Sequence, residues 1–201
     1  MKRSLAPSFS LLLVTLLVMF LTASNFNNDV HQKTVSKVDN FTLNDYNGNS
    51  HSLTDYKSYK FIVLMFISTQ CPVSNAYNEK MNKLFEDYHP ENIAFIGLNS
   101  NKSESIENIK EHAKAHSFQF PILKDWDNVI ADRLNAQVTP EIFVLNKEFD
   151  ILYHGRIDDA RGAGSAKNSD LISALNNLLE GKEVTIKQTR AVGCTIKRVG
   201  S

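Results

Sequence analysis

Hydrophobic residues in this chain of 201 residues follow two kinds of pattern. Continuous apolar runs, rich in β-branched and aromatic residues, cover positions 60–67 and 93–98, and such runs are typical of strands buried on both faces of a sheet. Between them, apolar residues recur at helical spacing from Pro72 to Tyr88, with Pro72 acceptable in a first turn and His89-Pro90 as the stop. The chain therefore begins as alternating strand and helix.

The same alternation continues toward the C-terminus. Asn47-Gly48 is a tight-turn dipeptide and predicts a short hairpin at the start of the domain. Beyond the second buried run, the pattern predicts a helix at 103–116 with Ser103 as its N-cap, a strand at 121–123, a helix at 128–134, strands at 141–145 and 151–157, and a helix at 169–180. The order predicts an α/β fold with a central mixed, mostly parallel sheet and helices on both faces.

The N-terminal residues have the pattern of a targeting segment. Lys2 and Arg3 precede an apolar core at 11–21 and small residues at 22–24. We interpret 1–24 as an export signal that is either cleaved or kept as an N-terminal anchor, 25–36 as a linker, 37–183 as the domain and 184–201 as a C-terminal tail. Both alternatives place the domain outside the cytoplasm, in a periplasmic or other extracytoplasmic compartment where disulfides persist.

Length and charge exclude several classes of protein. Without residues 1–24, 177 residues remain (201 minus 24), which suits one domain with a full hydrophobic core. The chain has 22 Lys and Arg against 22 Asp and Glu, with no clustered basic face of the kind that binds nucleic acid. No second apolar segment is long enough to cross a bilayer, so membrane contact is expected only through an uncleaved N-terminal segment.

Two cysteines, Cys71 and Cys194, carry the candidate chemistry. Cys71 follows the first buried strand directly and precedes a predicted helix. The first backbone N–H groups of a helix and its macrodipole favour an anion there, which stabilises the reactive thiolate. Cys71 is therefore the candidate nucleophile, and Cys194 lies close to the C-terminus.

Three local signatures accompany this element order: Asp39–Leu43 with the following Asn47-Gly48, the strand that ends in Cys71, and Val138–Phe143 with Pro140 at its centre. Together they resemble the thioredoxin fold, in particular its extracytoplasmic redoxin branch, the alkyl hydroperoxide reductase and thiol-specific antioxidant (AhpC/TSA) peroxiredoxin-like proteins. The resemblance implies a cis Thr139–Pro140 bond facing Cys71 and presenting backbone groups to an extended substrate. Taken alone, the residues favour an ordinary trans proline at a strand edge.

The chain departs from both common motifs of these families. Thioredoxins have Cys-x-x-Cys, whereas Ser74 stands at the second cysteine position here. Peroxiredoxins have Pro-x-x-x-Thr/Ser-x-x-Cys, of which Ser68 matches the hydroxyl position while Leu64 replaces the proline. The segments Gly155–Asp159 and Gly193–Lys197 are similar to a peroxiredoxin-like redoxin group that ends in Gly-Cys-x-Ile-Lys.

The resemblance implies a thiol-dependent oxidoreductase. Cys71 would be the nucleophile and Cys194 the resolving cysteine, and the expected site-shaping residues are Ser68, Ser74, Thr139 and Pro140. The substrate would be a peroxide, which gives antioxidant activity, or a protein disulfide, and electrons would come from an external thiol or dithiol reductant protein.

The alternative is a non-catalytic thioredoxin-fold binding module in which Cys71 and Cys194 form a permanent disulfide. Closing a loop of about 120 residues would stabilise the fold by about 4–5 kcal/mol in the chain-entropy model. A sulfur–sulfur separation far beyond disulfide reach, with an ordered tail, would remove Cys194 from the mechanism unless that tail can move.

No cofactor or metal is implied, because the chain has no glycine-rich phosphate loop and no convincing ligand cluster. His112 and His116 are four residues apart, but no third ligand lies close in sequence, so a solvated helix face is expected. We expect a solvated turn for the charged segment 156–161 and a core position for Trp126. Tyr77 either borders the site or packs in the core.

Overall fold

The computed structural model describes residues 35–160 and 166–200. The predicted export signal at 1–24 and most of the linker, up to residue 34, lie outside the described residues. None of the helices in the described part of the chain is long and apolar enough to cross a membrane.

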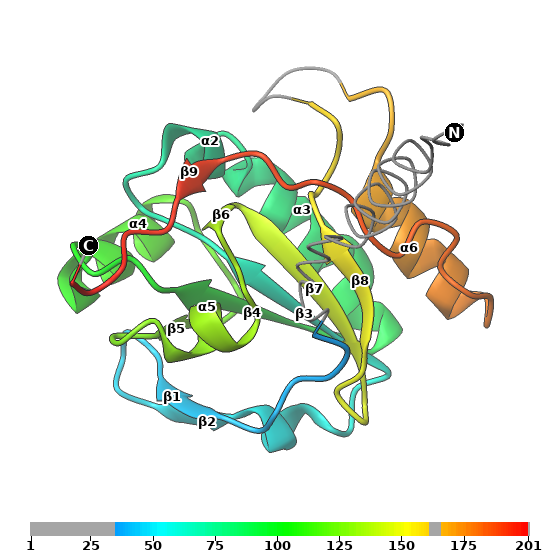
Figure 1. Cartoon of the computed structure of the whole chain (residues 1–201), viewed down its shortest axis with the longest axis horizontal. Helices are drawn as coiled ribbons and strands as arrows, with labels where there is room; N and C mark the ends of the chain where they lie inside the picture. The colour runs from blue at the N-terminus through cyan, green and yellow to red at the C-terminus, as the bar shows by residue number, and fades with distance from the viewer. Residues whose placement is uncertain (1–34, 161–165, 201) are drawn as a thin grey trace, which may run out of the picture. The chain divides into compact units, whose positions relative to one another are not determined.

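A five-stranded mixed sheet forms the centre of the domain, in the order β5-β4-β3-β7-β8 (Figure 1). Strand β3 pairs in parallel with β4, which pairs in parallel with β5, whereas β3–β7 and β7–β8 are antiparallel. The strands are β3 (Phe61–Phe66), β4 (Ile93–Asn99), β5 (Ile122–Lys124), β7 (Glu141–Asn146) and β8 (Ile151–Gly155). The mixed sheet predicted from the alternating pattern is confirmed.

Alternate residues of β3 face two separate cores. Val63 and Met65 pack on one side with α3 (Asn78–Tyr88), α4 (Ile106–Ala115) and α6 (Asp170–Leu179). Leu64 and Phe66 pack on the other side, where α5 (Val129–Arg133) and the N-terminal segments cover the sheet. Helices therefore lie on both faces, and the predicted hairpin is present as β1 (Thr42–Asn44) and β2 (Ser50–Ser52). The two short 3₁₀ turns are η1 (Leu53–Tyr56) and η2 (His89–Glu91).

Two of the predicted helices differ from the structure by more than a terminal residue. The helix expected from Pro72 is divided into α2 (Pro72–Asn75) and α3, because Tyr77 N–H bonds to Ser74 O, three residues back instead of four. The helix expected from Ser103 begins at Ile106, and its N-cap is Ser105. Ser105 is the N-cap because its hydroxyl accepts a hydrogen bond from the Asn108 N–H while the Asn108 side-chain oxygen accepts one from the Ser105 N–H.

The C-terminal tail crosses the domain as an extended segment. It first follows β8, where His154 N–H donates to Lys187 O and Thr189 N–H donates to His154 O. It then forms β9 (Cys194–Thr195), which pairs antiparallel with β6 (Val138–Thr139). Figure 1 shows this red segment passing β6 and α2. The tail is thus an ordered part of the domain surface.

Candidate active site around Cys71 and Cys194

Cys71 lies at the turn between β3 and α2, as its sequence position predicts. It is the N-cap of α2, and the Ser74 N–H donates to its sulfur over 3.3 Å. The Cys71 side chain is only 3 % exposed. A backbone N–H aimed at the sulfur favours the thiolate whenever the sulfur is reduced.

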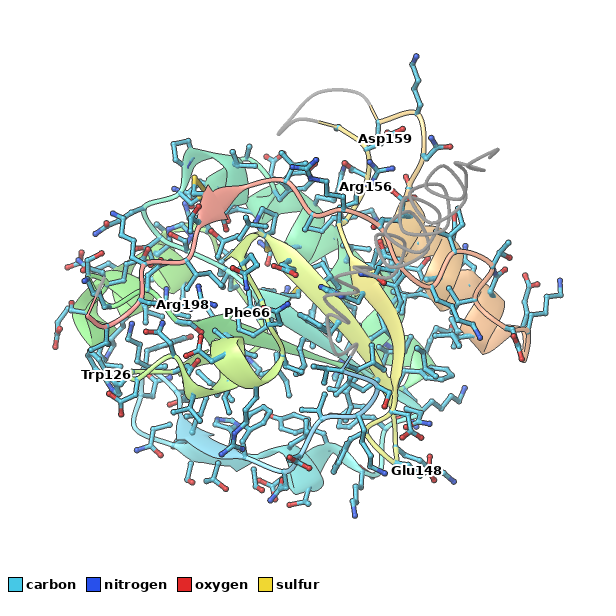
Figure 2. All side chains as sticks on the ribbon, viewed as in Figure 1. Phe66, Trp126, Glu148, Arg156, Asp159 and Arg198 are labelled. Atoms are coloured by element: carbon cyan, nitrogen blue, oxygen red, sulfur yellow. A yellow bond between two sulfur atoms is a disulfide. The ribbon has the colours of Figure 1, made fainter. Side chains whose placement is uncertain are left out.

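The structure joins Cys71 and Cys194, 123 positions apart in sequence, in a disulfide with their Cα atoms 5.8 Å apart. The yellow sulfur bond is visible beside β9 in Figure 2. Cys194 remains partly exposed, whereas Cys71 is covered. The two sulfurs therefore meet, and Cys194 is the less buried residue of the pair.

Thr139 and Pro140 face the disulfide from a third segment. The Thr139–Pro140 bond is cis, which confirms the expectation drawn from the resemblance. The Thr139 carbonyl oxygen lies 3.2 Å from Cys71 Sγ, and the Thr139 backbone pairs with that of Cys194. The cis-proline loop thus contacts both cysteines.

Glycine at position 193 makes this close approach possible. A Cβ added to Gly193 would overlap the Thr139 carbonyl group, 2.6 Å from its carbon. Any other residue there would push the tail away from β6. The close approach of the Thr139 backbone therefore requires glycine at the position before Cys194.

Ser68 has no hydrogen-bonding capacity left for a substrate. Its hydroxyl donates to Glu104 Oε1 over 2.5 Å and accepts the N–H groups of Gln70 and Cys71 over 3.2 and 3.0 Å. A serine hydroxyl has one proton and two lone pairs, and all three are used. Ser68 shapes the turn below Cys71 instead of pointing a free donor at the sulfur.

Ser74 stands where thioredoxins have their second cysteine, and it is buried. Its hydroxyl accepts the Ser68 N–H over 3.2 Å, while its own N–H donates to Cys71 Sγ. Ser74 therefore ties the start of α2 to the end of β3, in place of a second thiol.

Two buried acids near the site were not predicted. Glu141 follows Pro140, and its Oε2 accepts the N–H groups of Gln137 and Val138 over 2.7 and 3.1 Å. Its Oε1 lies 2.6 Å from His154 Nε2. Glu104 receives the Ser68 hydroxyl. A glutamate after the Thr-Pro pair was the available signal for Glu141, whereas Glu104 lies in a polar stretch that looks solvated.

A pocket of about 190 Å³ adjoins the cis-proline. Its lining residues are Tyr77, Pro140, Arg156, Ile157, Asp158, Asp159, Ala160 and Val192. Figure 2 labels Arg156 and Asp159 at this end of the domain. Both alternatives expected for Tyr77 hold, because its side chain packs in the core and also lines this pocket.

The solvated turn expected at 156–161 is wrong for Asp158. Asp158 is buried, its Oδ1 lies 2.8 Å from the Tyr77 hydroxyl, and its Oδ2 pairs with Lys80. Tertiary pairing with α3 removes this carboxylate from water. Arg161 lies outside the described residues.

The core position expected for Trp126 is also wrong, because its side chain is 51 % exposed. Trp126 is labelled at the edge of the view in Figure 2. Lys124 is buried instead, and its ammonium group lies 4.8 Å from the centre of the Trp126 ring. The indole covers a buried cation, which keeps one face of the ring in contact with the protein.

His112 on α4 is partly buried, whereas His116, the C-cap of α4, is exposed, so the solvated helix face expected for this pair is correct only for His116. His112 Nε2 lies 3.3 Å from Asn78 Nδ2, and its ring is 4.4 Å from that of His116. Within residues 35–160 and 166–200, no group of three His, Cys, Asp or Glu side chains is arranged to hold a metal ion.

Comparisons with known proteins agree with this geometry. The sequence model of the AhpC/TSA family matches residues 35–154. The thiol-disulfide oxidoreductase ResA of Geobacillus thermodenitrificans is 26 % identical over 137 residues, which cover 68 % of this chain and 77 % of ResA.

Solved structures agree as well. A hypothetical protein from Sinorhizobium meliloti 1021 superposes with a TM-score of 0.78 at 31 % identity, over 83 % of this chain and 94 % of that protein. The thioredoxin domain of a thiol-disulfide oxidoreductase from Bacteroides vulgatus has a TM-score of 0.54 at 20 % identity, over 64 % and 89 % of the two chains. The fold is thioredoxin-like.

Proposed function

This chain is a thiol-based oxidoreductase of the AhpC/TSA family, and we propose that it exchanges disulfides with polypeptides, with Cys71 as nucleophile and Cys194 as resolving cysteine. One observation carries the proposal. The tail places Cys194 against Cys71 and against the cis-proline loop, where it supplies the second thiol that Ser74 does not.

In the oxidative half of the cycle, the Cys71 thiolate attacks a sulfur of a substrate disulfide. That disulfide breaks, a mixed disulfide forms, and one substrate cysteine leaves as a thiolate. The Cys194 thiolate then attacks Cys71 Sγ, which releases the second substrate thiol and forms the Cys71–Cys194 bond. The substrate gains two electrons and the enzyme loses two.

A dithiol reductant protein restores the enzyme. Cys194 is the less buried residue of the pair, so we expect the reductant thiolate to attack Cys194, with the electron pair of the broken bond going to Cys71. The Ser74 N–H stabilises the leaving thiolate over 3.3 Å. The second reductant thiol then releases Cys194 and completes the reduction.

The hydrogen bonds of Ser68 favour disulfide exchange over peroxide reduction. A peroxide bound beside Cys71 needs a donor to polarise its O–O bond, and the motif resemblance would assign that role to Ser68. The only proton of the Ser68 hydroxyl is already donated to Glu104. Antioxidant activity toward peroxides is therefore the less favoured of the two reactions.

The pattern of residues 1–24 supports export as part of this proposal, with the enzyme acting outside the cytoplasm on exported polypeptides. Disulfides persist there, so both substrates and reductants of this kind have a role.

The test compares two substrates and two variants. Purified protein is given a disulfide-bonded polypeptide or hydrogen peroxide, with a dithiol as electron source. We expect turnover with the polypeptide and much slower peroxide consumption. Cys194→Ser should accumulate a mixed disulfide between Cys71 and the substrate, visible as an adduct on non-reducing gels and by mass spectrometry, whereas Cys71→Ser should form none.

Faster turnover of peroxide than of the polypeptide would assign the enzyme to peroxide reduction. Failure to reduce either substrate, together with a Cys71–Cys194 bond that resists a strong dithiol, would favour the binding module with a structural disulfide.

A further inference from the structure

A buried carboxylate lies directly below the Cys71 turn. The Glu104 side chain is 1 % exposed, in the loop between β4 and α4. Its Oε1 accepts the Ser68 hydroxyl over 2.5 Å, and its Oε2 accepts Thr69 N–H and Asn99 Nδ2 over 2.7 and 2.6 Å. Two of these three donors belong to the segment that leads into Cys71.

Glu104 orients the Ser68 hydroxyl. Because the Ser68 proton points at the carboxylate, the oxygen lone pairs point at the N–H groups of Gln70 and Cys71. A neutral amide at position 104 would not reproduce this arrangement, since it offers one oxygen and one NH₂ group in place of two acceptor oxygens. The Cys71 backbone is thus two hydrogen bonds away from the charge of Glu104.

The same buried cluster reaches the tail. The Lys124 ammonium donates to Asn99 Oδ1 over 2.9 Å and to Asn101 O over 2.6 Å. Asn101 Oδ1 accepts the N–H of Lys197, three residues after Cys194, over 2.9 Å. One polar cluster therefore contacts both cysteine-bearing segments.

The hydrogen bonds keep Glu104 ionised although it is buried. Burial raises the pKa of the Glu104 carboxyl, but the bonds from Ser68, Thr69 and Asn99 outweigh it, and the pKa lies below its ordinary value. The neighbouring charges are Lys124 and Asp125 near the end of β5 and His112 on α4. Burial lowers the pKa of Lys124 and of His112, while Glu104 opposes both shifts.

We propose that Glu104 is a positioning residue for disulfide exchange at Cys71: its carboxylate orients the turn through Ser68, and its negative charge disfavours the Cys71 thiolate and so favours the Cys71–Cys194 disulfide. The inference rests on the proposed function, because it assigns the balance between thiolate and disulfide at that same pair. A like charge nearby destabilises a thiolate, and a destabilised thiolate makes the disulfide harder to reduce.

The test replaces the charge with its neutral isostere. Glu104→Gln is compared with the wild type and with Glu111→Gln, which makes the same change at an exposed position of α4. The first readout is the equilibrium between the Cys71–Cys194 disulfide and a dithiol buffer. The second is the pH profile of Cys71 alkylation, measured in the Cys194→Ser background.

We expect Glu104→Gln to shift the disulfide equilibrium toward the dithiol by about tenfold and to move the midpoint of the alkylation profile to lower pH. Glu111→Gln should leave both unchanged. Glu104→Asp keeps the charge, so it should retain the wild-type midpoint. A role confined to packing would lower the thermal unfolding temperature of Glu104→Gln without moving either readout, and that result would overturn the inference.

Ser68→Ala provides a second variant if Glu104→Gln does not fold. It keeps the carboxylate and its bond from Thr69 N–H but removes the Ser68 hydroxyl that joins Glu104 to the Gln70 and Cys71 N–H groups, so disulfide formation between Cys71 and Cys194 should slow by about tenfold. An unchanged rate would contradict the positioning role. An inactive wild type would defeat the proposed function itself, whereas an active wild type with unaltered variants defeats only the role of Glu104.

Discussion

The backbone of Cys194 pairs with that of Thr139, so the tail meets the cis-proline loop through a strand pairing and meets Cys71 through a disulfide. The two contacts reinforce each other. The strand pairing presents the Cys194 sulfur to Cys71, and any change that weakens the pairing should weaken the disulfide.

Gly193→Ala tests this coupling. The added Cβ would overlap the Thr139 carbonyl group and displace β9 from β6. Relieving such overpacking costs about 1–3 kcal/mol, so the disulfide equilibrium should shift toward the dithiol by about tenfold. Quenched redox titrations with separation of the two forms measure it. Val199→Ala, at an exposed position of the same tail, is the control, and equal shifts in both variants would remove Gly193 from this role.

The stability of the reduced protein distinguishes a redox-active disulfide from a purely structural one. Because the cysteines are 123 positions apart in sequence, the chain-entropy model predicts that reduction lowers the free energy of unfolding by at most about 4–5 kcal/mol. Because the domain has two hydrophobic cores beside its sheet, we expect the reduced protein to stay folded with a lower urea midpoint. Complete unfolding on reduction would instead identify the disulfide as a structural requirement.

Ile196 anchors the tail independently of the disulfide. Its side chain is 3 % exposed and belongs to the core that contains Leu64 and Phe66, and its N–H donates to Gln137 O. Ile196→Ala should lower the free energy of unfolding by about 2–5 kcal/mol in the oxidised protein.

After reduction, Ile196→Ala should also release the tail, seen as faster hydrogen exchange at residues 194–197. Val199→Ala, at an exposed position of the same tail, should change neither quantity. Exchange that stays slow in reduced Ile196→Ala would show that another contact holds the tail.

The pH dependence of the free energy of unfolding should reveal the ionisation of the Glu104 carboxyl. Its pKa in the folded protein lies below the ordinary value of 4.5, so the unfolded state binds the proton more tightly. Stabilisation by the carboxylate is therefore complete above about pH 5.5 and is lost as the pH falls through the folded pKa.

Urea unfolding of the wild type and of Glu104→Gln between about pH 3 and pH 7 measures this effect, because a carboxyl group titrates within this range. The wild type should be the more stable at pH 7, and the difference should shrink in acid. A constant difference across this range would mean that the pKa of Glu104 is the same in the folded and unfolded proteins.

The sequence by itself determined most of the sheet and the position of Cys71. The buried strands β3 and β4 are apolar runs whose identity needs only local pattern. The strand-to-helix turn at Cys71 follows from the change of period after it. The prediction of the cis Thr139–Pro140 bond required the family resemblance, because the same sequence is compatible with a cis and with a trans bond until the surrounding residues are placed.

Only the tertiary structure decided which polar residues are buried. Glu104 and Asp158 lie in polar segments that look solvated, while the apolar Trp126 lies outside and the charged Lys124 inside. Burial depends on which distant segments cover a residue, and local periodicity carries no information about them.

The pairing of the two cysteines was likewise decided only by the tertiary structure. Cys71 was placed by its own turn, but Cys194 reaches it through contacts made far away in sequence, by Gly193 on Thr139 and by Ile196 in the core. Gly193 lies 54 positions from Thr139 (193 minus 139), and Ile196 lies 59 positions from Gln137 (196 minus 137), to which its N–H donates, so no single segment specifies these contacts. The sequence therefore determined where the reactive sulfur is, and the packing of the tail decided which sulfur it meets.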